Sequence, residues 1–380
     1  MNQISYIGDD GWSVIGEFLE DAKIRSVLLV TGRSAFSSSG AEAALAGILK
    51  GKRVRRVSDF ETNPKADDVC RILSSVGKDD AYDAIIAVGG GSVLDVAKLL
   101  KAFWSSAHPV VGYLDGHEDL EPNTIPLIAI PSTAGSGSEA THFAVVYHGK
   151  EKFSVAHEAI LPNLAVIIPS LLASLPQSVA AASGMDALCQ GIESYWSIYS
   201  TSESQELAKE AISLAWKSLK RAVCDKDERS LHGIAQASYS AGRAINLTKT
   251  TAPHAVSYAL TSFYGVQHGH AVGLLVPEFL EYNNEVSKGD CLDQRGHEWV
   301  KSQLLVISEL LGCENVSSAS QAIRDLLREL GLETDLTKLG IKTEADIDIL
   351  VKNGFNPQRV NNNPRLVTEA GLRALLGKLI

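Results

Sequence analysis

The stretch AIIAVGGGSVLDVAKLLKAF, residues 84–103, carries the strongest indication of the fold. Ala84–Val88 is a short apolar run typical of a buried strand, and Val93–Phe103 has the spacing of a helix. The glycines between them allow close backbone approach, and the N–H groups at a helix start favour a diphosphate. The stretch matches neither GxGxxG nor the P-loop. A plain strand-to-helix turn is the alternative, but it rarely needs three successive glycines, so we expect a phosphate site.

The rest of the first half alternates short apolar strands with helical segments. Strands are predicted at Ser26–Thr31, Val54–Val57 and Pro126–Ile130, with helices at 40–49 and 65–76 and a further β-rich stretch at 141–170. Alternation of this kind predicts a parallel sheet covered on both faces. The polar loop 131–139 follows the strand after the triglycine. Since loops at the carboxyl ends of parallel strands line the ligand crevice, two such loops indicate one extended, phosphate-bearing cofactor.

From about Leu172 the sequence shows helical periodicity and no convincing strand. Helices are predicted at 178–199, 203–224, 230–247, 251–262 and 301–311. We therefore expect an α/β dinucleotide-binding domain at 1–171 and an all-α domain at 172–380. The polar segment Val286–His297, with two glycines, is where we most expect mobility.

Composition excludes several classes of protein. The chain has 380 residues, 45% of them hydrophobic and 21% charged, which is typical of a soluble protein of two domains. A net charge of −10 argues against a nucleic-acid partner or an anionic membrane surface. The five scattered cysteines form no CxxC pair, and no stretch approaches a membrane span or a signal peptide. We expect a cytoplasmic protein with no nucleic-acid and no membrane partner.

A second pattern indicates a metal. Asp186 and Gln190 lie one turn apart on a predicted helix, and His254 and His268 follow fourteen residues from each other. One carboxylate and two imidazoles suit Zn²⁺ or Fe²⁺. Alone, this spacing is weak, because ten histidines produce accidental pairs.

Several motifs, in order, resemble the group III, or iron-containing, metal-dependent alcohol dehydrogenases. They are GGGSVLDVAK (89–98), PSTAGSGSEAT (131–141), SGMDAL (183–188), PHAVSYALTSFYGVQHGHAVGLLVPEFLEYN (253–283) and NNPR (362–365). The resemblance implies a dehydroquinate-synthase-like architecture, a metal between the two domains, and hydride transfer between NAD(P) and an alcohol or carbonyl carbon. It also implies that Asp186, Gln190, His254 and His268 are the four metal ligands. We further expect a homodimer.

Two positions depart from the family pattern. The family's second ligand is histidine, whereas Gln190 offers a neutral carboxamide that binds Fe²⁺ or Zn²⁺ more weakly. Gln190 is then a distant fourth ligand or a donor to bound water, the alternative being loss of the metal. Tyr258 replaces a relay histidine, and a phenol ordinarily loses its proton only near pH ~10. His270 is a candidate substitute, and a purely structural histidine is equally compatible with the sequence.

The sequence partly indicates whether the cofactor is NADPH or NADH. NAD-preferring relatives place an acid where Gly32 stands, and with Arg33 beside it we expect NADPH rather than NADH, although Arg33 could equally be an exposed loop residue. Asn63-Pro64 resembles a family loop near the cofactor, and Lys152 matches a lysine by the nicotinamide ribose. The expected cofactor-binding residues are Gly32, Arg33, Asn63, Pro64, Gly89, Gly90, Gly91, Ser92, Asp95, Ser132, Thr133, Ser136 and Lys152.

Residues 246–270 look most like the branch that reduces phosphonoacetaldehyde to 2-hydroxyethylphosphonate. A phosphonate needs cations and hydrogen-bond donors. The candidates before His254 are Arg243, Asn246, Lys249, Thr250 and Thr251; the alternative role for Lys249 is to cap the C-terminus of a helix. We therefore expect a metal-assisted, NAD(P)H-dependent reductase of a small anionic aldehyde. The alternatives are a reductase of another small carbonyl compound, a dehydroquinate-synthase-like lyase, and a catalytically dead cofactor-binding protein.

Overall fold

The computed structural model of the chain describes residues 3–76, 82–104, 110–114, 116, 120, 124–149, 151–355 and 360–379. The chain forms two compact units, Met1–Leu175 and Pro176–Ile380. The boundary expected at 171/172 falls within a short 3₁₀ helix, η3 (Pro169–Ser174), at the end of the first unit. Pro176 is the N-cap of the first helix of the second unit.

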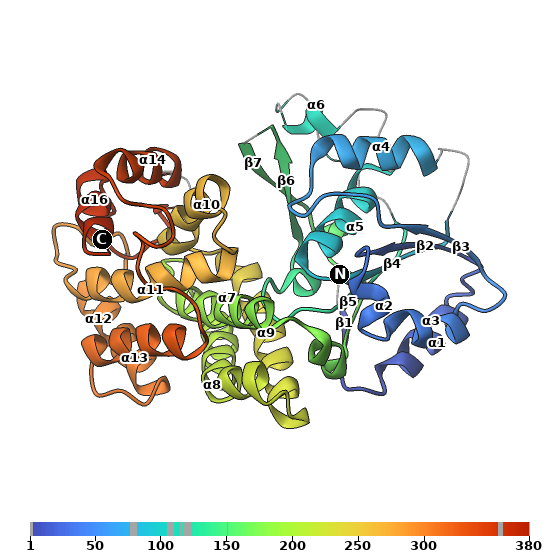
Figure 1. Cartoon of the computed structure of the whole chain (residues 1–380), viewed down its shortest axis with the longest axis horizontal. Helices are drawn as coiled ribbons and strands as arrows, with labels where there is room; N and C mark the ends of the chain where they lie inside the picture. Colours follow the sequence, from blue (N-terminus) through green and yellow to red (C-terminus); the bar gives the residue numbers. More distant parts are fainter. Residues whose placement is uncertain are drawn as a thin grey trace. The chain divides into compact units, whose positions relative to one another are not determined.

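The first unit is built on a six-stranded parallel sheet in the order β1-β8-β5-β4-β2-β3 (Figure 1). Its strands are β1 (Ile4–Ile7), β2 (Ser26–Thr31), β3 (Arg53–Val57), β4 (Ala84–Gly89), β5 (Leu127–Pro131) and β8 (Leu164–Ile167). The strands β6 (Phe143–His148) and β7 (Glu151–Ala156) form a separate antiparallel pair. The predicted parallel sheet is confirmed. The sequence analysis did not predict β1, a half-exposed edge strand without a continuous apolar run.

Helices cover both faces of this sheet. Alternate strand residues explain why: Leu28 and Ile85 belong to one buried apolar cluster, whereas Leu29 and Ile86 belong to another. The first cluster packs against α4 (Ala66–Val76) and α5 (Gly91–Phe103), and the second against α1 (Gly11–Asp21) and α3 (Ala41–Ile48) (Figure 1). The short helices are α2 (Ala35–Ser38), α6 (Val110–Leu114), η1 (Ser138–Ala140) and η2 (Glu158–Ile160).

The described part of the second unit consists of helices and their connections, which confirms the predicted all-α domain. The helices are α7 (Gln177–Trp196), α8 (Ser202–Cys224), α9 (Glu228–Thr248), α10 (Ala252–Tyr264), α11 (His268–Asn284), α12 (His297–Leu310), α13 (Val316–Glu329), α14 (Glu344–Gly354) and α16 (Glu369–Gly377). From Gly184 to Trp196, α7 is buried on all sides. It contacts α8, α9 and α11 and is the central helix of the unit.

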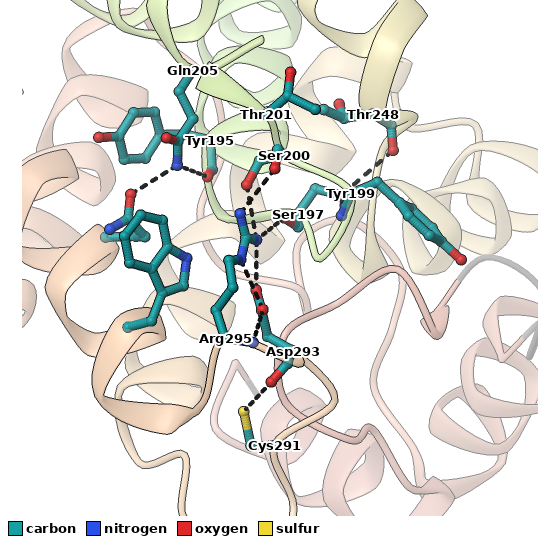
Figure 2. A network of polar contacts seen from close by, with 12 residues as sticks. Tyr195, Ser197, Tyr199, Ser200, Thr201, Gln205, Thr248, Cys291, Asp293 and Arg295 are labelled. Atoms are coloured by element: carbon teal, nitrogen blue, oxygen red, sulfur yellow. Dashed lines mark hydrogen bonds and ion pairs between the residues drawn. The ribbon is translucent and has the colours of Figure 1, made fainter. Parts of the chain in front are cut away.

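The polar connection between α11 and α12 is held by internal hydrogen bonds (Figure 2). The Arg295 guanidinium donates to Asp293 Oδ2 at 2.6 Å, to Ser200 O at 2.8 Å and to Ser197 O at 3.1 Å. Because Ser197 is the C-cap of α7, these bonds fix the end of the central helix. The segment was expected to be mobile because it is polar, but its polar residues Asp293 and Arg295 form hydrogen bonds that hold the turn between α7 and α8.

Helix α5 carries a lysine in the apolar interior of the first unit. Lys101 is 2% exposed, and its Nζ donates to Asn163 Oδ1 at 2.9 Å. Burial lowers the pKa of Lys101 to about 8. Between pH 8 and the ordinary value of 10.5, the unfolded chain holds a proton that the folded chain has lost. The free energy of unfolding therefore gains a contribution that increases with pH across this window.

The Lys101→Met variant should lack this contribution. The stability difference between wild type and variant should move in favour of wild type by up to about 3 kcal/mol between pH 8 and 10.5, as measured by urea unfolding. Lys50→Met, at an exposed position, is the matched control and should follow the wild-type curve. A wild-type–Lys101→Met difference that is constant with pH would contradict the assignment.

Candidate cofactor and metal sites

The expected cofactor residues of the first unit gather at one edge of the sheet. Strands β5, β4 and β2 are neighbours and run parallel, with Thr31 opposite Val88 and Gly89 opposite Pro131. The loops that begin at Gly32, Gly90 and Ser132 therefore leave the sheet side by side. Carboxyl ends of neighbouring parallel strands are where open α/β sheets bind ligands. The arrangement is that expected for one extended cofactor.

Packing in the folded chain requires the three glycines. A Cβ on Gly90 would lie 3.2 Å from the Thr133 side chain, and one on Gly91 would lie 2.7 Å from Ser136 Oγ. A Cβ on Gly89 would come within 2.4 Å of Val93. The glycines thus bring the two polar loops into contact, and Ser132 N donates to Gly89 O at 2.9 Å. Gly90, the N-cap of α5, offers no side-chain acceptor, which leaves this helix start suited to an anion.

The structure also brings Asn63, Pro64 and Lys152 to this region. Asn63 N donates to Ser92 Oγ at 3.1 Å, which joins the Asn63–Pro64 turn to the triglycine loop. Pro64 O accepts from Tyr147 N at 2.7 Å, and Lys152 is the partner of Tyr147 across the β6–β7 hairpin.

Asp95 is engaged with protein donors. Its Oδ1 accepts from Ser138 Oγ at 2.6 Å and its Oδ2 accepts from Val145 N at 3.0 Å. One turn later the fully buried Lys98 donates to Ser138 Oγ at 2.9 Å and to Thr141 Oγ1 at 2.8 Å. Both side chains hydrogen-bond α5 to the segment after β5, so Asp95 stabilises the end of the second polar loop.

Two arginines lie at the turn after β2. Arg33 forms an ion pair with Asp59 at 2.7 Å, and both side chains are largely exposed. The second of them, Arg56, was not among the expected cofactor-binding residues. Its Nη2 donates to the carbonyl oxygens of Gly32 and Arg33, both at 3.2 Å, and its Nε donates to Thr31 Oγ1 at 2.9 Å. The run of arginines in β3, RVRRV, was the available signal.

In the second unit, the expected metal ligands come together from three helices. Ligand atoms of Asp186, His254 and His268 all lie within 4.8 Å of one another, the single such cluster within the part of the chain that the structure describes. Asp186 Oδ1 is 3.2 Å from His254 Nε2 and 3.9 Å from His268 Nε2. Gln190, 3% exposed, follows Asp186 by one turn on α7. One carboxylate and two imidazoles fit a divalent metal such as Fe²⁺ or Zn²⁺, so the residues present suit the ion that the sequence predicts.

A glycine makes this convergence possible. A Cβ on Gly269 would lie 1.9 Å from Ala182 O and 2.8 Å from Asp186 Cβ. Helix α11 can therefore approach α7 this closely only with glycine next to His268. The close approach places the second histidine beside the carboxylate.

A residue that the sequence analysis missed completes the cluster. Glu193, fully buried on α7, hydrogen-bonds His254 Nδ1 through Oε1, while its Oε2 accepts from Thr251 N at 2.7 Å and Thr251 Oγ1 at 2.8 Å. Burial lowers the pKa of His254, but the charges and hydrogen bonds of Glu193 and Asp186 outweigh it and raise the pKa to about 10. Its position two turns after Asp186, on the same helical face, was the available signal.

The two proton-donor candidates have different surroundings. The Tyr258 ring stacks on His268, with centroids 5.6 Å apart and planes within 9°. His270 is buried, and its Nε2 must donate to Glu333 O, at 2.7 Å, because a carbonyl oxygen only accepts. Burial lowers the pKa of His270. Tyr258 thus lies beside the candidate metal ligands, whereas His270 is hydrogen-bonded to the backbone of the α13–α14 connection.

The five substrate candidates differ in exposure. Arg243 and Lys249 are exposed, Asn246 and Thr250 are partly buried, and Thr251 is fully buried. Lys249, the C-cap of α9, has a φ of +60°, a conformation that residues other than glycine rarely adopt. Thr250 O accepts from Asn362 Nδ2 at 3.0 Å, which joins this loop to the NNPR motif.

Comparison with known proteins identifies the family. Residues 2–169 match the iron-containing alcohol dehydrogenase model, and residues 180–380 match the Fe-containing alcohol dehydrogenase family, C-terminal model. The chain belongs to the iron-containing alcohol dehydrogenase family. The expected family and fold are confirmed, and the protein is an enzyme of the NAD(P)-dependent alcohol dehydrogenase class.

Three relatives of this family are informative. Phosphonoacetaldehyde reductase of Streptomyces viridochromogenes is 33% identical over 78% of this chain and 76% of its own. NAD-dependent methanol dehydrogenase of Bacillus methanolicus is 30% identical over 96% and 94%, respectively. The structure of sulfoacetaldehyde reductase from Bifidobacterium kashiwanohense in complex with NAD+ superposes with a TM-score of 0.88 at 28% identity, covering 99% of this chain and 96% of that one. Among the described residues, no helix has the length and apolar character needed to cross a bilayer.

Gly269→Ala should push α11 away from α7, because the added methyl group would meet a backbone carbonyl rather than a mobile side chain. We expect a loss of about 1–3 kcal/mol in unfolding free energy and a weakened metal site. Urea unfolding and metal content after dialysis measure the two effects. Gly16→Ala, within α1 and with no atom within 4 Å of the added Cβ, is the control. It should leave the metal content unchanged and should not lower the unfolding free energy, because alanine is the better helix former. Retention of wild-type metal content by Gly269→Ala would contradict the role assigned to this contact.

Proposed function

We propose that the protein reduces a small aldehyde to a primary alcohol with NAD(P)H and the assistance of one divalent metal. The cluster of Asp186, His254 and His268 is the observation that carries the proposal, since its donor atoms lie within 4.8 Å of one another. When bound, such a metal supplies a Lewis acid for a carbonyl oxygen, and the nicotinamide supplies a hydride.

The chain's own residues have distinct roles in this reaction. Asp186, His254 and His268 hold the metal, and Gln190 is the fourth ligand or a donor to bound water. Tyr258 is the preferred proton donor for the alkoxide, because its ring stacks on His268 whereas Nε2 of His270 is engaged with Glu333 O. The polar loops around Gly90 and Ser132 bind and orient the dinucleotide phosphates.

We propose an aldehyde with an anionic group on the adjacent carbon as the substrate, with phosphonoacetaldehyde, reduced to 2-hydroxyethylphosphonate, as the leading compound. Two relatives support this choice, since one is named for phosphonoacetaldehyde and the other for sulfoacetaldehyde. Lys249 offers an exposed cation five residues before His254, on a backbone with a φ of +60°. Strained backbone of this kind concentrates at ligand sites.

We propose NADPH as the preferred cofactor. Arg33 follows Gly32 at the turn after β2, and the guanidinium of Arg56 holds the carbonyl oxygens of both. Two cations at this turn, with glycine where an acid would repel a 2′-phosphate, favour the phosphorylated dinucleotide.

The decisive test is the rate of NADPH or NADH oxidation. The protein is first freed of metal with a chelator, and one portion is reloaded with Fe²⁺, one with Zn²⁺ and one is left without metal. Each form is offered NADPH or NADH with phosphonoacetaldehyde, sulfoacetaldehyde and the neutral propionaldehyde. We expect turnover only with metal, fastest with NADPH and an anionic aldehyde. Full activity of the metal-free form, or no net oxidation with any carbonyl compound, would reject the proposal. The second outcome would favour a lyase that uses NAD transiently or a protein that only binds cofactor.

Lys249→Ala tests the anionic substrate. Loss of one charge-assisted contact should lower kcat/KM for phosphonoacetaldehyde by about 10–100-fold, the equivalent of about 1.5–3 kcal/mol, and leave that for propionaldehyde within about threefold. The substitution keeps a Cβ, so the strained backbone is not relieved. Lys288→Ala, at another exposed lysine of the second unit, is the matched control. Equal losses on the charged and the neutral aldehyde would contradict recognition of the anion by Lys249.

A further inference from the structure

Glu193 is the one fully buried carboxylate that contacts an expected metal ligand within the described residues of the second unit. We propose that Glu193 is a positioning residue, which orients His254 toward the metal and compensates for the weak ligand at Gln190. This inference rests on the proposed metal site.

The orientation follows from the hydrogen-bonding chemistry of the pair. An ionised carboxylate only accepts, so His254 must donate through Nδ1 to Glu193 Oε1. A histidine that binds a metal carries a single ring proton, and this contact places that proton on Nδ1 and leaves the lone pair on Nε2. Nε2 is the atom that lies 3.2 Å from Asp186 Oδ1, on the side of the metal cluster. Glu193 therefore selects the one tautomer of His254 that can bind a metal there.

The other oxygen of Glu193 fixes the helix that carries His254. Thr251, the N-cap of α10, donates both its N–H and its hydroxyl to Glu193 Oε2. Trp196 Nε1 in turn donates to Thr251 Oγ1 at 2.9 Å. All these groups are at most 4% exposed, so the carboxylate obtains three hydrogen bonds in place of water. One side chain of α7 thus fixes both the start of α10 and the imidazole one turn later.

The hydrogen bond from His254 to Glu193 matters more because Gln190 is a weak ligand. With a neutral carboxamide in place of a third imidazole, the metal receives less electron density from its direct ligands. A carboxylate that accepts the Nδ1 proton makes the imidazole a better ligand, and loss of such a partner typically weakens metal binding by about 10–100-fold. The negative charge of Glu193 thereby reaches the metal through His254.

The test is the Kd for Zn²⁺, measured by competition with a chromogenic chelator, in wild type and Glu193→Gln. Glutamine keeps the size of the side chain but removes the charge, and we expect a Kd that is higher by about 10–100-fold. In Co²⁺-loaded protein the visible absorption bands should also shift, a change that a purely structural role would not produce. Glu210→Gln is the matched control. Glu210 accepts hydrogen bonds from Gln236 and Ser240 on the neighbouring helix, and its substitution should leave Kd and spectrum unchanged.

A second variant, Thr251→Val, keeps the shape and the N–H of the cap residue and removes the hydroxyl that donates to Glu193 and accepts from Trp196. It should raise the Kd by a smaller factor, about two- to tenfold, and it tests the inference if Glu193→Gln does not fold. A wild-type protein that binds no Zn²⁺ would reject the proposed metal site itself. If the wild type binds Zn²⁺ and the Kd of both folded variants lies within threefold of the wild-type Kd, the role of Glu193 is overturned and the proposed function stands. If Glu193→Gln does not fold, the same result for Thr251→Val alone has the same meaning.

Discussion

The contact between α11 and α7 at Gly269 is the constraint on which the second unit depends. A backbone carbonyl, Ala182 O, occupies the space that any larger side chain would need. Because the two helices meet this closely, His268 lies beside Asp186 although more than eighty residues separate them in the chain. The hydrogen bonds of Glu193 hold His254, on α10, at the same point. The grouping of the three candidate metal ligands is thus a consequence of how α10 and α11 pack against the buried α7.

The first unit uses glycine in the same physical way for a different purpose. Gly90 and Gly91 leave room for Thr133 and Ser136, and the two polar loops therefore meet at the carboxyl ends of β4 and β5. Buried charge supports the loops from beneath, since Asp95 and Lys98 share Ser138 as a hydrogen-bonding partner. In both units a polar site is built where the absence of a Cβ allows two segments to approach, and hydrogen bonds from acidic or basic side chains hold the segments there.

Short-range patterns made much of this molecule predictable. Strands β2 and β4, the triglycine turn and the long helices α7 to α9 agree with the sequence analysis to within a few residues. The reason is that these strands are apolar on both faces and that the apolar residues of the helices have helical spacing. The edge strand β1 escaped prediction because half of its surface faces solvent, and Glu193 escaped because a glutamate in a helix is ordinarily a solvated residue. Arg56 was similarly hidden within an arginine-rich edge strand.

The family and the two-part architecture could be predicted from the sequence, because they depend on motifs and on local hydrophobic periodicity. The chemical types of the candidate metal ligands could be predicted in the same way. The contacts of each polar residue became apparent only from the packing of the folded chain. It directed Asp95 to Ser138 and Val145, bound His270 to a backbone carbonyl, stacked Tyr258 on His268 and placed Glu193 against His254. The physical reason is that a hydrogen bond is directional and short. Its partner depends on how distant segments pack, which the spacing of residues along one chain does not encode.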